Sequence, residues 1–277
     1  MKRIVTMQDI SCVGKCSLTV ALPVISAMGI EASVIPTAVL STHTMFEGFT
    51  FHDLTDSIQP TMRHFLQQGF TFDAIYTGYL GSFDQLDIAK VLFQEFGKDA
   101  LKIVDPCMAD NGKLYVGFTT EFAHAMKDLC AKADIICPNL TEASYMLDVE
   151  YTENYDEAYI QDLLKQLANL GCHKVVLTGI SFEKGKLGAY AYDKDNDSFF
   201  YYCTDEEPKH FHGTGDIWAS TLCGAMMNEK GFEESIRIAC DYVKECIRLT
   251  LLEKNHNEYG VNFEQAMPYL IERLHKK

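Results

Sequence analysis

Several features that mark membrane, extracellular and nucleic-acid-binding proteins are missing from this sequence. No apolar run approaches the roughly 18 residues that a membrane-spanning helix needs. Basic residues are scarce: Lys and Arg total 24 against 39 Asp and Glu, which leaves a net charge of −15. Because a field of that sign repels nucleic acid and anionic membrane surfaces, the sequence predicts neither as a partner.

The ten cysteines include no Cys-x-x-Cys pair and no spacing typical of a zinc site. Several lie in apolar runs, such as the one that ends at Cys137, which favours buried thiols in a reducing compartment over a disulfide framework. The N-terminus starts with basic Lys2 and Arg3 but reaches Asp9 too soon for the apolar core of a signal peptide. We therefore expect a cytoplasmic protein.

Three common ligand-binding motifs are also missing. The sequence has no Gly-x-x-x-x-Gly-Lys-Ser/Thr loop and no His-Glu-x-x-His, and the late pair Gly213 and Gly215 lacks the third glycine of a dinucleotide fingerprint. These absences argue against P-loop, dinucleotide-binding and zinc-peptidase classes. An acidic chain can still bind a polyphosphate locally, through backbone N–H groups, a helix N-terminus or a metal ion.

What the sequence does contain is a regular alternation of short apolar runs and amphipathic segments. The predicted strands span residues 4–7, 33–35, 74–76, 102–104, 135–137, 174–178, 188–192 and 199–203. The predicted helices span residues 14–28, 53–68, 83–96, 119–132, 142–147, 157–170, 216–228, 233–254 and 263–274. This pattern predicts a single α/β domain over residues 1–277, with a central, mostly parallel sheet flanked by helices on both faces. Ligands of such sheets bind beyond the carboxyl ends of the strands.

The run Gly213–Asp216 leads directly into an apolar helix. Gly213, Thr214 and Gly215 leave several backbone N–H groups unpaired at the positive end of the helix dipole, an arrangement that suits an anion. Asp216, in the first turn, could accept a proton from a substrate hydroxyl, and we expect the local field to lower its pKa. A helix capped by glycines, with an aspartate at its N-terminus, is the structural alternative.

Two further segments place polar side chains at strand ends. Asn139 and Glu142 follow the predicted strand at 135–137, and Asp105 ends the strand at 102–104. Asp105 beside Glu142 would pair two carboxylates, a suitable site for Mg²⁺ that carries ATP phosphates. A capped short helix after residue 138 and an ordinary Asp-Pro strand end are the structural alternatives.

Taken in this order, the three segments resemble the signature of the ribokinase superfamily, an Asn-x-x-Glu segment followed by a late Gly-x-Gly-Asp run. Within that superfamily the chain is most similar to the pyridoxal kinases: Ser41–Thr44 resembles their Ser-Asn-His-Thr segment, and Tyr76–Ser82 their Gly-Tyr segment. The resemblance implies a ribokinase-like fold. It also implies ATP- and Mg²⁺-dependent phosphorylation of the 5′-hydroxymethyl group of pyridoxal, pyridoxine or pyridoxamine, by a homodimer.

The same resemblance implies roles for individual residues. The implied substrate-binding residues are Asp9, Ser11, His43, Thr44 and Tyr79. The implied ATP-binding residues are Asp105, Asn139, Glu142, Thr178 and Tyr115. Asp105 and Glu142 would also serve Mg²⁺, Gly213–Gly215 would form the anion hole, and Asp216 would be the catalytic base.

The segment after the first strand departs from the pyridoxal kinases, which carry a substrate-binding serine there. In this chain Asp9 or Ser11 occupies that place. An aspartate is similar to the hydroxymethylpyrimidine kinases of thiamine synthesis, which are the alternative in the same enzyme class. Asp9 would favour a cationic aminomethyl group and so pyridoxamine.

Two more alternatives stay open at this point. A ligand-binding sensor on the same fold, without catalysis, is the alternative from another functional class. His43, Tyr79 and Tyr115 could also be ordinary core or surface residues.

Overall fold

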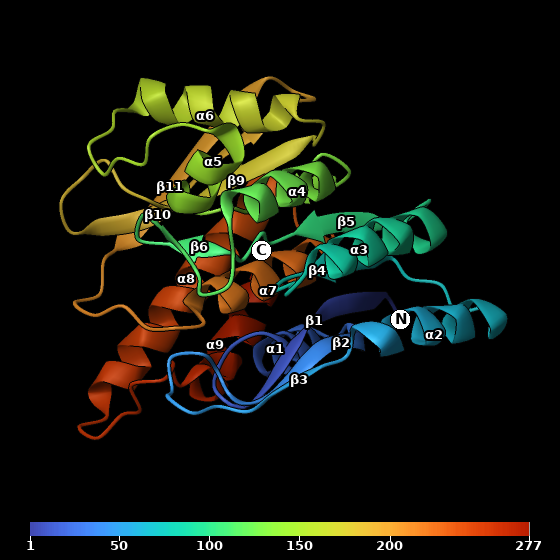
Figure 1. Ribbon diagram of the computed structural model, residues 1–277. Helices are drawn as coiled ribbons and strands as arrows, with labels where there is room; N and C mark the ends of the chain where they lie inside the picture. Colours follow the sequence, from blue (N-terminus) through green and yellow to red (C-terminus); the bar gives the residue numbers. More distant parts are fainter. Residues whose placement is uncertain (277) are drawn as a thin grey trace.

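A computed structural model describes residues 1–276. It contains a nine-stranded sheet in the order β11-β10-β9-β8-β5-β4-β1-β2-β3 (Figure 1). The strands of this sheet are β1 (Arg3–Val13), β2 (Glu31–Thr42), β3 (Phe51–Asp53), β4 (Ala74–Thr77), β5 (Leu101–Val104), β8 (Ile135–Ile136), β9 (Lys174–Ile180), β10 (Lys186–Asp193) and β11 (Ser198–Asp205). The central strands, in the spatial order β2-β1-β4-β5-β8-β9, pair in parallel. At the edges, β3 pairs antiparallel with β2, and β10 pairs antiparallel with both β9 and β11. A separate small hairpin joins β6 (Ala109–Asp110) and β7 (Lys113–Leu114).

Helices cover both faces of the sheet (Figure 1). Within residues 1–276 they are α1 (Leu18–Ala27), α2 (Thr55–Gln67), α3 (Phe83–Phe96), α4 (Thr120–Cys130), α5 (Leu140–Leu147), α6 (Glu157–Asn169), α7 (Thr214–Met227), α8 (Phe232–Leu252) and α9 (Phe263–His275). One core lies under α2–α6 and includes Ile58, Leu86 and Ile160. The other face is covered by α1, α7 and α8, through residues such as Ile25 and Leu222, and α9 packs beside them. The predicted α/β class, with a mostly parallel sheet between two helical layers, is confirmed.

The predicted helix at 14–28 is wrong over its first four residues, because α1 begins only at Leu18. Gly14 and Ser17 have φ values of 157° and 47°, which a right-handed helix does not contain. The preceding strand is correspondingly longer than predicted. It continues to Val13 because it pairs with β2 as far as Thr42.

A second difference concerns Asp53, the first residue of the predicted helix at 53–68. Asp53 instead ends β3, an edge strand of three residues that is too short to carry a recognisable alternation, and Leu54 occupies the cap. The Asp53 carboxylate nevertheless accepts a hydrogen bond from the Thr55 N–H at 2.7 Å. It therefore still satisfies one unpaired donor of the first turn.

The central parallel strands direct the loops that follow them to one edge of the sheet. β4, β5 and β8 end at Thr77, Val104 and Ile136, and all three residues are fully buried. The residues that follow these strands, and those after β1, are thereby brought together. None of the helices within residues 1–276 combines the length and the apolar composition that crossing a membrane would require.

Candidate active site

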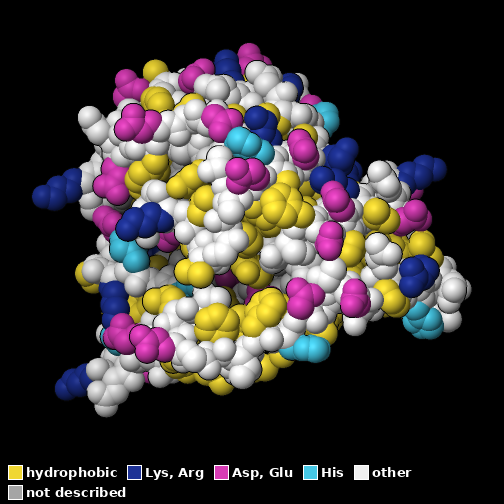
Figure 2. Space-filling view, in the orientation of Figure 1, with side chains coloured by type: hydrophobic (Ala, Val, Ile, Leu, Met, Phe, Trp, Pro, Cys, Tyr) yellow, Lys and Arg dark blue, Asp and Glu magenta, His cyan; other side chains and the backbone are white. Residues whose placement is uncertain are grey.

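A cavity of about 720 Å³ lies at the carboxyl ends of the parallel strands, within the range typical of small-molecule sites. Figure 2 shows the hollow on this face of the molecule, with hydrophobic and acidic side chains around it. All of the residues singled out from the sequence line this cavity: Asp9, Ser11, His43, Thr44, Tyr79, Asp105, Tyr115, Asn139, Glu142, Thr178, Gly213, Thr214, Gly215 and Asp216. The fold thus brings together segments that are more than 200 positions apart in the sequence.

Gly213 and Gly215 open α7 for different steric reasons. Gly213 is the N-cap residue, with a φ of 79°, and a Cβ there would lie 1.8 Å from the carbonyl oxygen of Lys15. A Cβ on Gly215 would meet no atom within 4 Å. The backbone therefore requires glycine at 213, whereas glycine at 215 leaves open space beside the N–H groups of the first turn. That space, at the positive end of the helix dipole, suits an anionic group.

Asp216 lies in the first turn of α7 and is only 7% exposed. Its Oδ1 atom has no hydrogen-bond partner. Burial raises the pKa of Asp216 to about 8, with a further increase from the charge of Asp105, whereas the backbone N–H of Ser17 lowers it. The expectation of a lowered pKa was wrong, because desolvation and a neighbouring carboxylate outweigh the favourable helix terminus.

Asn139 and Glu142 form a capping box at the start of α5. The Asn139 side chain accepts the Glu142 N–H at 2.9 Å, and the Glu142 carboxylate accepts the Asn139 N–H at 2.9 Å. Glu142 also accepts the Met108 N–H at 3.0 Å, and the Asn139 amide donates to the Ala109 carbonyl at 2.8 Å. The capped short helix is therefore present. It fixes Glu142 in the cavity wall with part of its carboxylate already hydrogen-bonded.

Asp105 and Glu142 form a buried acidic pair that suits a divalent cation. Burial and the charge of Glu142 raise the pKa of Asp105 to about 8, and burial raises that of Glu142 to about 7 despite its backbone donors. In the part of the chain that the structure describes, neither carboxylate forms a salt bridge, and no group of three or more His, Cys, Asp or Glu residues is arranged to hold a metal ion. Two oxygen ligands at a cavity edge fit Mg²⁺, which commonly binds through one or two carboxylates together with water and phosphate.

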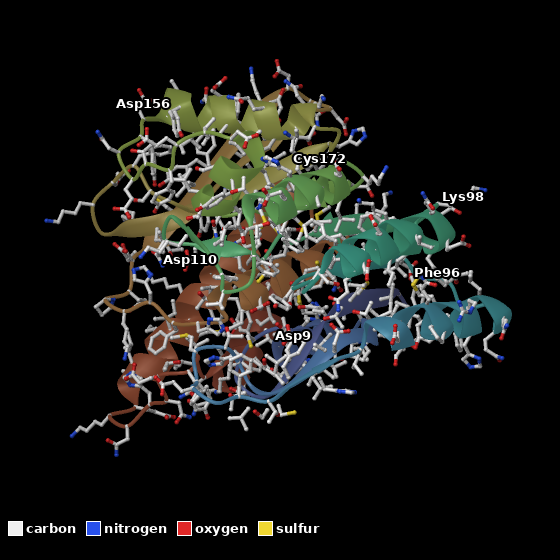
Figure 3. The ribbon with its side chains drawn as sticks, in the orientation of Figure 1. Asp9, Phe96, Lys98, Asp110, Asp156 and Cys172 are labelled. Carbon is white, nitrogen blue, oxygen red and sulfur yellow. The ribbon has the colours of Figure 1, made fainter. Side chains whose placement is uncertain are left out.

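The opposite end of the cavity is formed by β1 and the segments after β2 and β4. Asp9, labelled in Figure 3, is 4% exposed and accepts a hydrogen bond from the Ser11 hydroxyl at 3.1 Å. The β1–β2 register shifts between Gln8 and Ile10, so the ladder is irregular where Asp9 lies. Irregular pairing of this kind commonly re-aims a side chain at an active site.

Aromatic and histidine side chains surround this end of the cavity. His43 contacts the Tyr259 carbonyl through Nε2 at 3.1 Å, and its ring lies 4.4 Å from that of His212. Tyr79 packs against Phe118 with 5.5 Å between ring centroids. Thr44 is exposed at the cavity rim. His43 and Tyr79 are therefore packed residues that also face the cavity. An ordinary packing role for them is compatible with a substrate-binding role.

Thr178 and Tyr115 border the part of the cavity near Asn139. The Thr178 hydroxyl donates to the Pro138 carbonyl at 3.4 Å, and Thr178 forms an isolated bridge with Asn139. Tyr115 follows β7 and is 36% exposed. Its backbone N–H donates to the Met108 carbonyl at 2.9 Å, which holds the loop over the acidic pair.

Several cavity residues had no recognisable signal in the sequence. Cys16, Ser17 and Cys107 line it beside the carboxylates, because the β1–α1 turn and the Asp-Pro loop fold back over the strand ends. The basic residue Lys244 of α8 also lines the cavity. Gly14 was compatible with a turn in this segment, but it did not indicate the shape of the turn.

Comparison with known proteins identifies the family. The family model described as phosphomethylpyrimidine kinase matches residues 20–262. The chain belongs to the phosphomethylpyrimidine kinase family. This family is part of the ribokinase superfamily, so the predicted membership of a small-molecule kinase superfamily is confirmed.

Solved structures agree with this assignment. A "putative phosphomethylpyrimidine kinase" from Bacteroides thetaiotaomicron is 35% identical with a TM-score of 0.94, over 97% of this chain and 93% of that one. Another crystal form of that protein, with a TM-score of 0.93, contains pyridoxal. The pyridoxal kinase from Lactobacillus plantarum is 27% identical with a TM-score of 0.90, over 98% and 97% of the two chains.

A curated relative extends beyond the aligned region. A "putative pyridoxal kinase" from Schizosaccharomyces pombe is 26% identical over 209 residues, which cover 72% of this chain and 60% of the relative. The match thus spans less than two thirds of that relative's length.

Replacing Gly215 with Ala tests the anion-binding space without disturbing the fold. The added methyl group meets no atom within 4 Å, so we expect Tm to stay within about 2 °C of the unmodified protein. We expect kcat/KM for ATP to fall roughly 10²–10³-fold, as after loss of one oxyanion-hole donor. Gly213→Ala is the contrasting variant and should lower Tm by several degrees, because its methyl group would lie 1.8 Å from the Lys15 carbonyl. Full activity of Gly215→Ala in an ADP-release assay would contradict the assignment.

The acidic pair predicts an unusual dependence of stability on pH. Burial and the charge of Glu142 raise the pKa of Asp105 to about 8, well above the value of about 3.9 for an exposed aspartate. The folded protein therefore binds more protons at this pair than the unfolded chain does, and stability falls as the pH rises between these values. Asp105→Asn removes the titrating carboxyl group and, with it, this contribution to the pH dependence of stability. We expect its Tm, measured by scanning calorimetry, to decrease less than that of the unmodified protein between pH 5 and pH 8. The exposed Asp84 of α3 provides the control variant Asp84→Asn, and equal pH slopes in all three proteins would refute the acidic-pair account.

Proposed function

We propose that the protein transfers the γ-phosphoryl group of ATP to the 5′-hydroxymethyl group of a vitamin B6 vitamer. The observation that carries this proposal is the position of Asp216, whose buried, unpartnered Oδ1 atom lies in the same cavity as the glycine-lined start of α7. A base beside an anion-binding helix terminus is what phosphoryl transfer to an alcohol requires. The pyridoxal in the Bacteroides relative, at 35% identity, supports a B6 vitamer as the acceptor.

In this proposal Asp216 accepts the proton of the substrate hydroxyl while the hydroxyl oxygen forms a bond to the γ-phosphorus of ATP. The bond from the γ-phosphorus to the β–γ bridging oxygen breaks, and ADP leaves. Backbone N–H groups of Gly213, Thr214 and Gly215 stabilise the negative charge on the transferred group. The raised pKa of Asp216, about 8, makes its carboxylate a stronger base than an ordinary aspartate.

Asp105 and Glu142 are the residues that would hold Mg²⁺ in this site. Bound there with ATP, the ion would neutralise phosphate charge that this acidic chain cannot balance with lysines or arginines. Asn139, Thr178 and Tyr115 would then border the nucleotide. Because both ends of the Asn139 amide already form hydrogen bonds, we assign it mainly to holding Glu142 in place.

The substrate ring would lie toward Asp9, Ser11, His43, Thr44 and Tyr79. Tyr79 and His43 offer ring faces for stacking, and the Asp9 carboxylate offers an acceptor for a cationic substituent. The resemblance to pyridoxal kinases also leads us to expect a cytoplasmic homodimer, with the whole chain forming one kinase domain.

Hydroxymethylpyrimidine phosphorylation is the second candidate function. It is favoured by the presence of Asp9 in the segment where pyridoxal kinases carry a substrate-binding serine, and by the description of the matching family model. The mechanism at Asp216 would be the same, and only the ring contacts would differ.

A substrate panel tests both candidates. We expect ATP·Mg²⁺-dependent ADP release with at least one of pyridoxal, pyridoxine and pyridoxamine. Asp216→Asn should lower kcat roughly 10²–10⁴-fold, the usual contribution of a general base, while vitamer affinity stays nearly unchanged. Asp84→Asn, which alters an exposed aspartate in the first turn of another helix, is the matched control.

Each other outcome of the panel has a definite meaning. ADP release with hydroxymethylpyrimidine alone would assign the protein to thiamine synthesis. No release with any of the four compounds, together with vitamer binding, would support the non-catalytic sensor. Substantial activity of Asp216→Asn would refute the role of Asp216 as the base.

Asp9 makes a separate prediction about the choice of vitamer. If its carboxylate pairs with a cationic aminomethyl group, replacing Asp9 with Asn or Ser should lower kcat/KM for pyridoxamine relative to pyridoxal by roughly 10-fold or more. The measurement is the ratio of the two kcat/KM values at one pH. A ratio that does not change in either variant would eliminate Asp9 as a selector of charge.

A further inference from the structure

His43 is a buried residue at the start of an exposed segment. It is 3% exposed, whereas all the residues of Thr44–Thr50, which follow it, are exposed. Within this segment Thr44 lines the cavity. Near its two ends the segment is closed by hydrogen bonds, from the Ser41 N–H to the Thr50 carbonyl at 3.1 Å and from the Thr50 N–H to the Ser41 hydroxyl at 2.9 Å. His43 is thus the buried side chain next to a part of the cavity rim that is otherwise exposed.

Both ring nitrogens of His43 are hydrogen-bonded to the main chain. Nε2 lies 3.1 Å from the Tyr259 carbonyl oxygen, which can only accept, so Nε2 carries a proton. Nδ1 accepts the Met45 N–H at 3.3 Å, so Nδ1 is unprotonated. The two partners therefore define a neutral imidazole, in agreement with burial, which lowers the pKa of His43. A neutral imidazole has one donor and one acceptor, and neither is left for a substrate.

The Tyr259 carbonyl belongs to a loop between α8 and α9 that is itself fixed. The Lys15 ammonium group donates to the side chains of Asn262 and Glu264, at 3.2 and 2.8 Å. The Lys15 side chain also lies so close to Gly260 that a Cβ on this glycine would be 2.6 Å from it. The imidazole thus joins the exposed segment to a well-held part of the chain.

The His43 ring is also packed against other parts of the site. Its centroid lies 4.4 Å from that of His212 and 4.9 Å from that of Phe46. A Cβ on Gly14, in the β1–α1 turn, would lie 2.8 Å from its Cδ2 atom. His212 directly precedes Gly213, the N-cap residue of α7. Because a close-packed ring cannot turn unless its neighbours move, these contacts keep the two nitrogens directed at their main-chain partners.

We propose that His43 is a positioning residue and not a hydrogen-bond partner of the substrate: its two nitrogens fasten the segment Thr44–Thr50 to the loop of Tyr259 and so hold Thr44 at the cavity. The proposal rests on the proposed function and deepens it, because it assigns the hydrogen bonds to the vitamer to the other polar residues at this end of the cavity. His43 acts through Thr44 and has no contact with the reacting atoms.

Nitrogen-15 NMR of the imidazole groups tests the state of the ring directly, because it distinguishes a protonated from a bare ring nitrogen. Near neutral pH we expect His43 to carry a proton on Nε2 only, and to keep both hydrogen bonds when pyridoxal is added without ATP. The spectrum of His43→Gln identifies its signals among those of the nine histidines. A charged ring, a proton on Nδ1, or a change at either nitrogen when pyridoxal binds would overturn the proposal.

Two substitutions each keep one of the two hydrogen bonds. His43→Asn retains an acceptor for the Met45 N–H but does not reach the Tyr259 carbonyl, whereas His43→Gln retains a donor for that carbonyl but no acceptor for Met45. We expect each to raise the KM for pyridoxal roughly 3- to 10-fold, and His43→Ala, which keeps neither, to raise it roughly 10- to 100-fold. The kcat and the KM for ATP should change by less than about threefold, the pattern for lost ground-state binding of one substrate. His64→Gln, at an exposed histidine of α2, is the control and should change none of these values.

A double substitution separates this role from a general loss of stability. Thr44→Val removes the hydroxyl through which His43 acts. His43→Gln should therefore raise the KM for pyridoxal less in the Thr44→Val background than in the unmodified protein, because the two changes affect one contact. Equal increases in both backgrounds, or equal increases of the KM for pyridoxal and for ATP, would contradict the positioning role. If no vitamer is phosphorylated, the proposed function fails, while the NMR measurement on the unmodified protein still decides the state of His43.

Discussion

The site depends on the confinement of four carboxylates in one largely buried space, where none of them forms a salt bridge with a basic side chain among residues 1–276. Asp9, Asp105, Glu142 and Asp216 are each less than 10% exposed. Desolvation raises the pKa of all four, and such a cluster is costly unless protons, cations or hydrogen-bond donors compensate it. Neighbouring groups in the cavity supply part of that compensation. Backbone N–H groups donate to Glu142, the Ser11 hydroxyl donates to Asp9, and Asp216 lies in the first turn of α7.

This arrangement explains how a chain with a net charge of −15 could bind a negatively charged polyphosphate. Of the basic side chains, Lys244 lines the cavity, and it is already paired with Asp205 at 3.0 Å. In the proposed function, phosphate recognition would therefore rest on the N–H groups at the start of α7 and on the cation that accompanies the nucleotide. Such recognition is local and short-ranged, so the overall negative charge of the surface does not prevent it.

The sequence contained enough information for the fold and for the composition of the cavity, but not for its electrostatics or its turns. Strand and helix positions follow from periodicity, and Asn139, Glu142 and Asp216 are recognisable because cap and glycine patterns are local. The pKa of Asp216 was predicted in the wrong direction, since it depends on Asp105 and on burial, both of which arise from tertiary structure. Ser17 was missed because serine gives no sign of a positive φ. The packing of Lys15 and Thr19, not local preference, produces it.

The contact between Gly213 and the Lys15 carbonyl has a mechanical consequence. A close-packed contact with no room for a methyl group cannot absorb a displacement, so the two backbones must move together. The start of α7 and the β1–α1 turn, 198 positions apart, therefore behave as one body. Any displacement of the start of α7 would therefore be passed on to the β1–α1 turn, which lines the same cavity. The two halves of the cavity are thus joined directly through the main chain.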